Sequence, residues 1–446
     1  MVTQKRLAIQ GVAWIVLGYG ISQMIRLSSN LLLTRILVPE MFGLMALINA
    51  FIIGLSMFSD IGIGPSIIQN NRSDDPVFLN TAWTMQFLRG VILWLLCLII
   101  SWPLSFFYQD NRILWILPIT SLIMLIGGLN STAIYSLNKK LFIGKLISLE
   151  LTSQIISTAV MVLWAWVNPS IWALIIGNLV SSFIHMIWSH RLTSNYNNNF
   201  YWDRVAAKEV LSFGKWVFFS TAMTFLSVQA DNLILGKIFS LELLGVYIIA
   251  SVFANIPRQI IGQLSNKLIY PIISAQIHLH RRSLRSKIIE KRRLVLLLVA
   301  PFLAVLIGFG DLIILNLYDK RYAPGSWMLP ILAIGLWPRV LSYTIDPVFL
   351  ALGKPKYTAY GNLLVFLVLV VGVPITFYFS GIVLVITLIS AKELMSYIVV
   401  YYGLRKEKMA AAGQDIISTL FLLVLVVLTL VTREFLGLGS SFDLVL

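Results

Sequence analysis

Long apolar runs, separated by short polar connections, divide the chain from one end to the other. Each run has at least 20 residues, and a helix needs about 20 to cross the hydrocarbon core of a bilayer. The thirteen runs cover residues 8–34, 41–68, 79–102, 112–136, 142–167, 170–190, 211–238, 242–273, 294–317, 326–352, 358–379, 382–403 and 413–432. This pattern predicts a helical membrane protein with many spans, and we expect the first span to be retained because it is too long for a signal peptide.

The chain repeats part of its own sequence. Residues 30–43 align without a gap on residues 232–245, at an offset of 202, and Trp14 and Trp216 keep the same offset. Six predicted spans separate the two copies, and an even number gives both copies the same orientation in the membrane. This arrangement is typical of transporters whose halves are related by a pseudo-two-fold axis along the membrane normal.

The repeat predicts the domain organisation. We expect an N-terminal six-helix lobe at 1–203, a C-terminal six-helix lobe at 204–409, and an additional transmembrane segment with a tail at 410–446. The predicted fold class is therefore an all-α integral membrane protein, made of two six-helix bundles in parallel repeat plus one extra C-terminal helix. The substrate path is expected between the two lobes.

Charge supports the membrane assignment and gives it a direction. Only 12% of the 446 residues are charged, against about 25% in soluble domains. With the N-terminus inside, 21 of the 34 Lys and Arg residues lie in inner connections, six in outer connections and seven in or near the spans. This bias predicts a cytoplasmic N-terminus, and it explains the formal charge of +15 without a nucleic-acid partner.

Polar residues inside the first span form one stripe. Ser22, Arg26, Ser29 and Asn30 follow the spacing i, i+4, i+7 and i+8, which places them on one helix face. An Arg that faced lipid at mid-bilayer would cost roughly 2.5–3.5 kcal/mol on insertion scales. We therefore expect Arg26 to face a polar cavity, together with Arg258 and Arg339 of later spans. The predicted polar lining comprises Ser22, Ser29, Asn30, Asn255, Gln259 and Tyr343.

Two interpretations of these arginines remain open. Arg26, Arg258 and Arg339 could bind an anion such as pyrophosphate, because guanidinium offers a planar fork of donors to phosphate. Alternatively, each could pair with a carboxylate between helices, for example Arg339 with Asp346 or Arg258 with Asp231. The carboxylates inside the spans are likewise either sites for a coupling proton or sodium ion, or counter-ions; they are Asp60, Glu150, Asp231 and Asp346.

No recognisable motif indicates chemistry on a substrate. The chain has no phosphate-binding loop of the G-x-x-x-x-G-K-[ST] type, no Ser/His/Asp set, and one cysteine, Cys97, so no intrachain disulfide can form. The histidines lack the neighbouring ligands that a metal site needs. We expect no cofactor, no metal and no catalytic residue.

Two stretches resemble a known family. Residues 33–43 read LTRILVPEMFG, and residues 60–69 read DIGIGPSIIQ, with the pattern acidic-Gly-x-Gly-x-x-x-x-Gln. These stretches are similar to the opening of the polysaccharide transporter family, whose bacterial oligosaccharide flippases belong to the multidrug/oligosaccharidyl-lipid/polysaccharide exporter superfamily.

The resemblance implies a function and a location. It implies a MATE-like bundle of six plus six helices in the bacterial cytoplasmic membrane, which flips a polyprenyl-pyrophosphate-linked oligosaccharide by alternating access. It also implies that Arg26, Arg258 and Arg339 receive the pyrophosphate. The implied partners are this lipid-linked oligosaccharide, membrane lipids, a coupling proton or sodium ion, a polysaccharide polymerase and a chain-length regulator. Many members have fourteen spans, whereas this chain gives twelve plus one.

Two rival functions fit parts of the pattern. A multidrug or cation antiporter would share the fold, but its cavity should carry net negative charge. A polymerase or ligase that acts on the lipid-linked glycan would need a large outer loop with catalytic residues, and the outer connections here are short. The sugar composition of the substrate and the oligomeric state leave no trace in the sequence.

Overall fold

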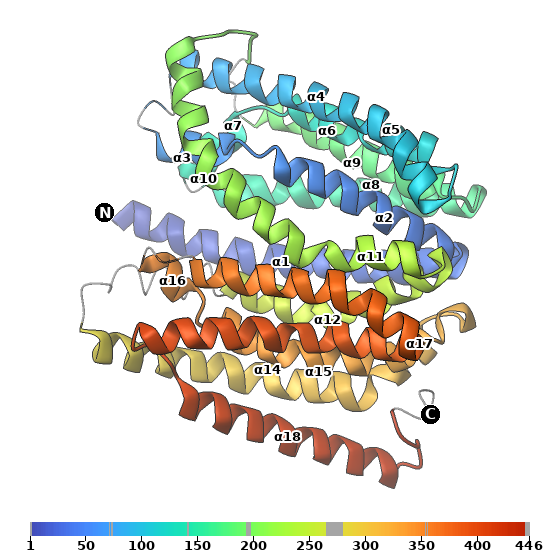
Figure 1. Cartoon of the computed structure of the whole chain (residues 1–446). Coiled ribbons are helices and arrows are strands. Elements are labelled where there is room, and N and C mark those ends of the chain that lie inside the picture. Colours follow the sequence, from blue (N-terminus) through green and yellow to red (C-terminus); the bar gives the residue numbers. More distant parts are fainter. Residues whose placement is uncertain are drawn as a thin grey trace. The chain divides into compact units, whose positions relative to one another are not determined.

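The computed structural model describes residues 2–70, 72, 75–140, 142–192, 198–264, 280–352, 354 and 356–441. Within these ranges the secondary structure is helical, and the helices are joined by short turns. The chain divides into two compact units, Met1–Phe225 and Leu226–Leu446. In each unit most of the helices run side by side (Figure 1).

The first unit holds the helices from α1 to most of α10. They are α1 (Val2–Ile36), α2 (Pro39–Phe58), α3 (Ile63–Gln69), α4 (Pro76–Tyr108), α5 (Ile113–Thr120), α6 (Leu122–Gly128), α7 (Ala133–Lys139), α8 (Ile143–Val167), α9 (Trp172–Arg191) and α10 (Arg204–Val228). The second unit holds the rest. It contains α11 (Ala230–Ile238), α12 (Leu241–Leu264), α14 (Arg281–Leu317), the 3₁₀ turn η2 (Lys320–Tyr322), α15 (Gly325–Tyr343), α16 (Pro347–Ala351), α17 (Lys356–Lys406) and α18 (Ala412–Phe435).

The all-α membrane class predicted from the sequence is confirmed. Nine helices of the described part are long and apolar enough to cross a membrane, or ten if one bent pair forms a single span. Each of the thirteen predicted segments overlaps a helix or a broken helix. The segments 358–379 and 382–403 form the two arms of α17, which breaks at Gly381 (φ 70°, ψ −158°). The six-plus-six repeat and the boundary at 203/204 remain predictions.

The motif after α2 makes a break in the second predicted span. Gly62 adopts φ 65°, a left-handed conformation that favours glycine, and its N–H donates to the Asp60 carboxylate at 2.9 Å. Arg89 of α4 donates to the Ser56 carbonyl (2.6 Å) and the Ser59 hydroxyl (3.0 Å), and so helps to satisfy the freed end of α2. Asp60 therefore has a structural role in ending one helix and starting the next.

A second broken span packs against the first. The segments Ile113–Gly128 and Ala133–Lys139 meet at an angle of 61°. The buried Gln86 amide donates to the carbonyls of Gly127, Gly128 and Asn130 at 3.0–3.2 Å, which satisfies backbone groups that lipid cannot. A Cβ on Gly64 would lie 2.6 Å from the Tyr135 ring, so glycine permits the close approach of α3 and α7.

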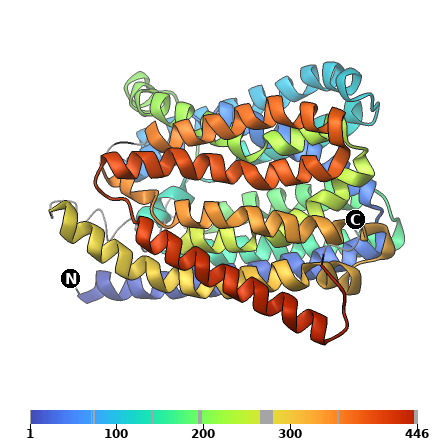
Figure 2. The same ribbon diagram turned by 60° about the horizontal axis from the view of Figure 1, so that its bottom comes forward.

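Two buried ion pairs fasten α18 to α14. Arg292 lies 2.5 Å from Asp415, and Arg433 donates to both Asp311 oxygens at 2.6 Å. In Figure 2 the two helices lie side by side, with α14 in yellow and α18 in red. The two pairs stand 18 or 19 residues apart on each helix, or about 28 Å at 1.5 Å per residue. This spacing is close to the ~30 Å thickness of the hydrocarbon core.

The sequence pattern did not reveal this role of Arg292. It belongs to the most basic stretch of the chain, residues 276–293, which lies between the predicted spans 242–273 and 294–317. The described part of that stretch instead forms the first turns of the 37-residue α14. Arg292 is 1% exposed and also donates to the Thr344 hydroxyl and the Leu341 carbonyl.

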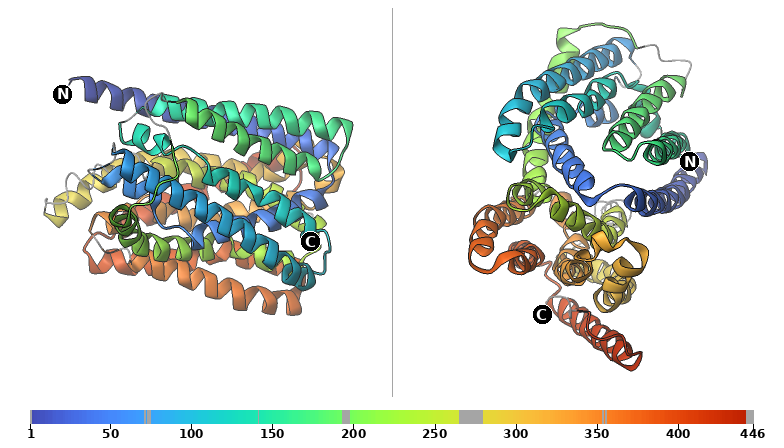
Figure 3. Two further views of the ribbon diagram at one scale, coloured as in Figure 1. Left: turned by 90° about the horizontal axis from the view of Figure 1, so that it is seen from above. Right: turned by 90° about the vertical axis from the view of Figure 1, so that its right-hand side faces the viewer.

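In the end-on view on the right of Figure 3, α18 lies at the margin of the second unit.

We predict that the Arg433–Asp311 pair stabilises the second unit. Asp311→Ala leaves a buried guanidinium without its carboxylate, and breaking one partner of a buried pair costs about 3–5 kcal/mol. The thermal midpoint of the purified protein, followed by fluorescence-detected size exclusion, should therefore fall.

Replacing both partners provides the control. Asp311→Leu with Arg433→Met removes both charges together and should recover most of the loss, because no unpaired charge remains. A single variant that is as stable as the unsubstituted chain would contradict the structural role of the pair.

Candidate functional site

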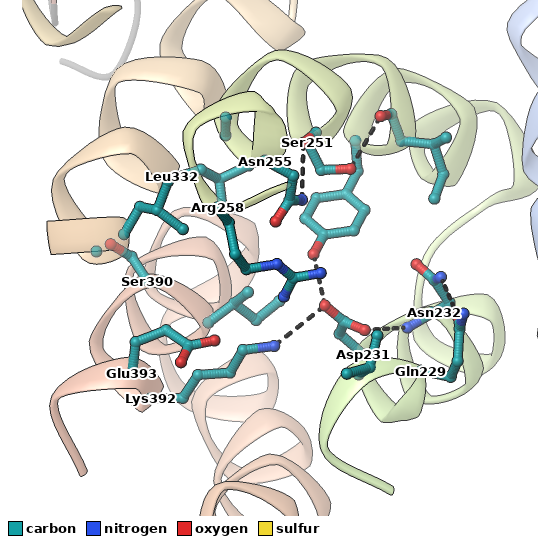
Figure 4. A pocket seen from close by; sticks show the side chains of 17 residues that line it. Gln229, Asp231, Asn232, Ser251, Asn255, Arg258, Leu332, Ser390, Lys392 and Glu393 are labelled. Atoms are coloured by element: carbon teal, nitrogen blue, oxygen red, sulfur yellow. Dashed lines mark hydrogen bonds and ion pairs between the residues drawn. The ribbon is translucent and has the colours of Figure 1, made fainter. Parts of the chain in front are cut away.

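A polar pocket of about 190 Å³ lies inside the second unit (Figure 4). Its polar side chains come from the α10–α11 break, from the start of α11, from α12 and from the second arm of α17. Ser251, Asn255 and Arg258 follow the spacing i, i+4 and i+7 on α12, so they share one face of that helix. The predicted lining residue Asn255 and the predicted anion-binding residue Arg258 therefore belong to one pocket.

Asp231 of α11 is held by several donors. Its Oδ2 lies 3.1 Å from the Lys392 ammonium and accepts a hydrogen bond of 3.0 Å from the Tyr247 hydroxyl. Its Oδ1 accepts from the Asn232 backbone N–H at 3.0 Å. The carboxylate is thus the counter-ion of a buried lysine, whereas the sequence suggested a pair with Arg258.

Glu393, the residue after Lys392, pairs with a different helix. It lies 3.5 Å from Nε of Arg339 on α15. Arg339 is 5% exposed, stacks 4.1 Å from the Tyr343 ring centroid and donates to the Tyr343 and Ser396 hydroxyls. Arg339 therefore has a carboxylate partner, but it is Glu393 rather than the Asp346 that the sequence suggested, and Arg339 does not line the pocket.

Arg258 is the cation of the pocket that is left without a carboxylate once Asp231 is paired with Lys392 and Glu393 with Arg339. Within the described residues its guanidinium makes no hydrogen bond or ion pair, although it reaches in beside Asp231 and Lys392 (Figure 4). The two lining carboxylates, Asp231 and Glu393, already face Lys392 and Arg339. A half-buried guanidinium that faces a polar pocket without a carboxylate of its own is suited to an incoming anion.

The remaining predicted residues of the second unit lie away from this pocket or at its edge. Asp346 sits in the turn between α15 and α16, and its Oδ1 is buried without a hydrogen bond to a described residue. Gln259 follows Arg258 on α12 and is half-buried, but does not line the pocket.

The first unit places the other predicted residues on α1 and α8. The Ser22 hydroxyl donates to the Gln154 side-chain oxygen at 2.7 Å, and the Gln154 amide returns a bond to the Ser22 carbonyl at 3.0 Å. One turn farther along α1, Arg26 is half-buried, as is Asn30, whereas Ser29 is buried. Glu150 lies on the exposed side of α8. The predicted meeting of Arg26 with Arg258 and Arg339 involves both units and stays a prediction.

Sequence reasoning missed Lys392, Glu393 and Tyr247. The adjacent Glu393 offers Lys392 a carboxylate in the sequence, which hides the fact that each residue pairs with another helix. A signal was nevertheless present, because the two charges stand near the middle of the apolar run 382–403. A side chain at mid-span is too far from the interface to reach it and has to find a partner inside the protein.

The fold matches solved transporters of the membrane. One is the lipid II flippase MurJ in an inward closed conformation, with a TM-score of 0.75 and 15% identity over 94% of this chain and 92% of that one. Another is the inward-facing conformation of a multidrug resistance MATE family transporter of the MOP superfamily. It gives a TM-score of 0.64 and 12% identity over 88% of this chain and 97% of that chain. At these identities the likeness concerns the fold alone, and it confirms the MATE-like architecture.

Sequence comparison identifies the family. The teichuronic acid biosynthesis protein TuaB of Bacillus subtilis (strain 168) is 23% identical over 302 residues, which is 68% of this chain and 62% of the Bacillus protein. The family model described as "Polysaccharide biosynthesis protein" matches residues 32–326, well over half of the chain and inclusive of both motif stretches. The resemblance seen in the sequence is thus confirmed, and the chain, a multi-pass membrane protein, belongs to the polysaccharide biosynthesis protein family.

Proposed function

We propose that the protein is a flippase that moves a polyprenyl-pyrophosphate-linked oligosaccharide across the cytoplasmic membrane by alternating access. The observation that carries the proposal is Arg258, which reaches into a polar pocket of the membrane-spanning unit with no carboxylate partner of its own among the described residues. A diphosphate would supply the missing negative charge through charge-assisted hydrogen bonds. Family membership supports a role in polysaccharide assembly.

The size and the polar groups of the pocket suit the phosphate part of the proposed substrate. At about 190 Å³ it holds a phosphate-sized group rather than a whole oligosaccharide. Ser251, Asn255 and Gln229 add hydroxyl and amide groups around Arg258, and such groups can bind phosphate or sugar oxygens. In this proposal Arg258 anchors the diphosphate, Arg26 contributes from the first unit, and the polyprenyl chain stays in lipid.

The charges of the pocket support a cation antiporter less well than they support an anion-binding flippase. A cation would need an available carboxylate, but both carboxylates of the pocket already face cationic side chains, Lys392 and Arg339. Lys392 in particular occupies the place beside Asp231 that a bound cation would take. Asp346, with its unbonded buried oxygen, remains a candidate for coupling transport to a proton or a sodium ion.

Arg258→Ala tests the site. We expect polymer export to fall at least about tenfold, equivalent to ~1.4 kcal/mol, because the anion loses its guanidinium. Protein level in the membrane should stay normal, since Arg258 makes no bond to other described residues. A leaflet-accessibility assay of the lipid-linked glycan in vesicles measures the flipping step directly, and Arg26→Ala tests the contribution of α1 in the same way.

Arg339→Ala provides the contrasting control. This change leaves Glu393 buried without its cation, so it should lower the amount of folded protein as well as export. Normal export from Arg258→Ala at normal protein level would refute the site assignment.

A second prediction concerns Asp231 and Lys392. Lys392→Met leaves Asp231 buried without its cation and should lower the protein level, by the destabilisation of about 3–5 kcal/mol that broken buried pairs show. Lys392→Met combined with Asp231→Asn should restore both the level, seen on an immunoblot of membranes, and export. If the double variant folds normally but exports nothing, Asp231 is more than a counter-ion and the assignment is wrong.

A further inference from the structure

A second, larger cavity opens at one end of the second unit, outside the site described above. Its volume is about 770 Å³, within the ~300–1,000 Å³ usual for ligand pockets. It lies where the start of α14 meets the end of α17 and the start of α18. Five lining residues carry a positive charge and, among the lining residues that the structure describes, no carboxylate is found; the five are Arg281, Arg282, Arg285, Arg405 and Lys408.

The start of α14 adds to this positive potential. The helix has 37 residues, and His280 caps it by accepting a bond from the Arg282 backbone N–H. The first turns of a helix carry unsatisfied N–H groups and the positive end of the macrodipole, so they favour anions. The three arginines of α14 that line the cavity thus stand at the end of the helix where an anion binds best.

The carboxylate nearest to Arg405 and Lys408 in the sequence does not offset these charges. Glu407 follows Arg405 by two residues, but both of its oxygens accept bonds from the Lys354 ammonium at 2.7 and 2.8 Å. Glu407 is therefore already neutralised by a lysine from outside the cavity lining. The cavity retains the charge of its five cations.

The backbone of Lys408 is held in an uncommon conformation. α17 ends in a Schellman motif: the Met409 N–H bonds the Leu404 carbonyl at 2.8 Å, and the Lys408 N–H bonds the Arg405 carbonyl at 3.2 Å. The left-handed position of this motif is normally glycine, yet it is Lys408, with φ 59°. A side chain kept at a strained position is a pointer to function, and this side chain lines the cavity.

We propose that this cavity binds a diphosphate group. Two linked phosphates present several oxygens and more than one negative charge to four guanidinium forks and an ammonium, whereas a single phosphate would leave most of these cations uncompensated. The Tyr401 ring at the cavity wall offers a face for a base or a sugar. The diphosphate could belong to a lipid-linked sugar or to a soluble nucleoside diphosphate. The proposal rests on residues other than those of the transport proposal and stands independently of it.

Titration calorimetry of the full-length protein in phosphatidylcholine nanodiscs tests the proposal. Inorganic pyrophosphate should bind at least about tenfold more tightly than inorganic phosphate. Arg282→Ala with Arg285→Ala should weaken pyrophosphate binding by about tenfold or more. The matched control, Lys287→Ala with Arg293→Ala, removes two exposed charges of the same helix outside the cavity and should change binding little. Equal losses in both pairs would show a diffuse charge effect and overturn the site.

Lys408→Gly separates binding from stability. Glycine suits the left-handed position, so the thermal midpoint should be unchanged or higher, whereas pyrophosphate binding should weaken. Unchanged pyrophosphate affinity in this variant and in the arginine pair would also overturn the proposal.

Competition identifies the source of the diphosphate. Uridine diphosphate that displaces pyrophosphate indicates a soluble ligand, and farnesyl diphosphate that displaces it more strongly indicates a lipid-linked one. Either result supports a diphosphate site. Failure of both to displace pyrophosphate would contradict it.

Discussion

The cost of an unpaired charge inside a membrane is the constraint on which the second unit depends. Four buried ion pairs, Arg292–Asp415, Arg433–Asp311, Lys392–Asp231 and Arg339–Glu393, each join two helices. The helices have little hydrophobic reason to associate in lipid, so a charge that needs a partner helps to select which faces meet. Arg258 differs from these paired charges, because it lies half-buried at a polar pocket without an acid of its own among the described residues.

Hydropathy alone predicted the membrane-spanning segments because a lipid solvent demands about 20 apolar residues in a row. It could not predict where a span breaks. The run 41–68 reads as one helix, yet Gly62 and the Asp60 cap divide it, and the run 112–136 is likewise bent by 61° between Gly128 and Ala133. Such breaks depend on single backbone conformations, which leave the average hydropathy of a segment unchanged.

Part of the candidate site could be predicted from the periodicity of the helix. The 3.6-residue period places Asn255 and Arg258 on one face of α12, and the structure finds both in one pocket. The pairing of charges was not predictable, because it depends on which helices pack together and how each is rotated. Proximity in sequence suggested Asp346 for Arg339, whereas the partner is Glu393, more than 50 residues away.

The neighbouring positions of Lys392 and Glu393 limit how the protein can change shape. Consecutive residues of a helix point about 100° apart, and this dipeptide uses that angle to hold α11 with one side chain and α15 with the other. A motion of any one of these three helices alone would separate opposite charges in a medium of low dielectric constant. α11, α15 and the second arm of α17 therefore have to travel as one rigid block, and bending is left to joints free of such ties, such as Gly381 between the two arms of α17.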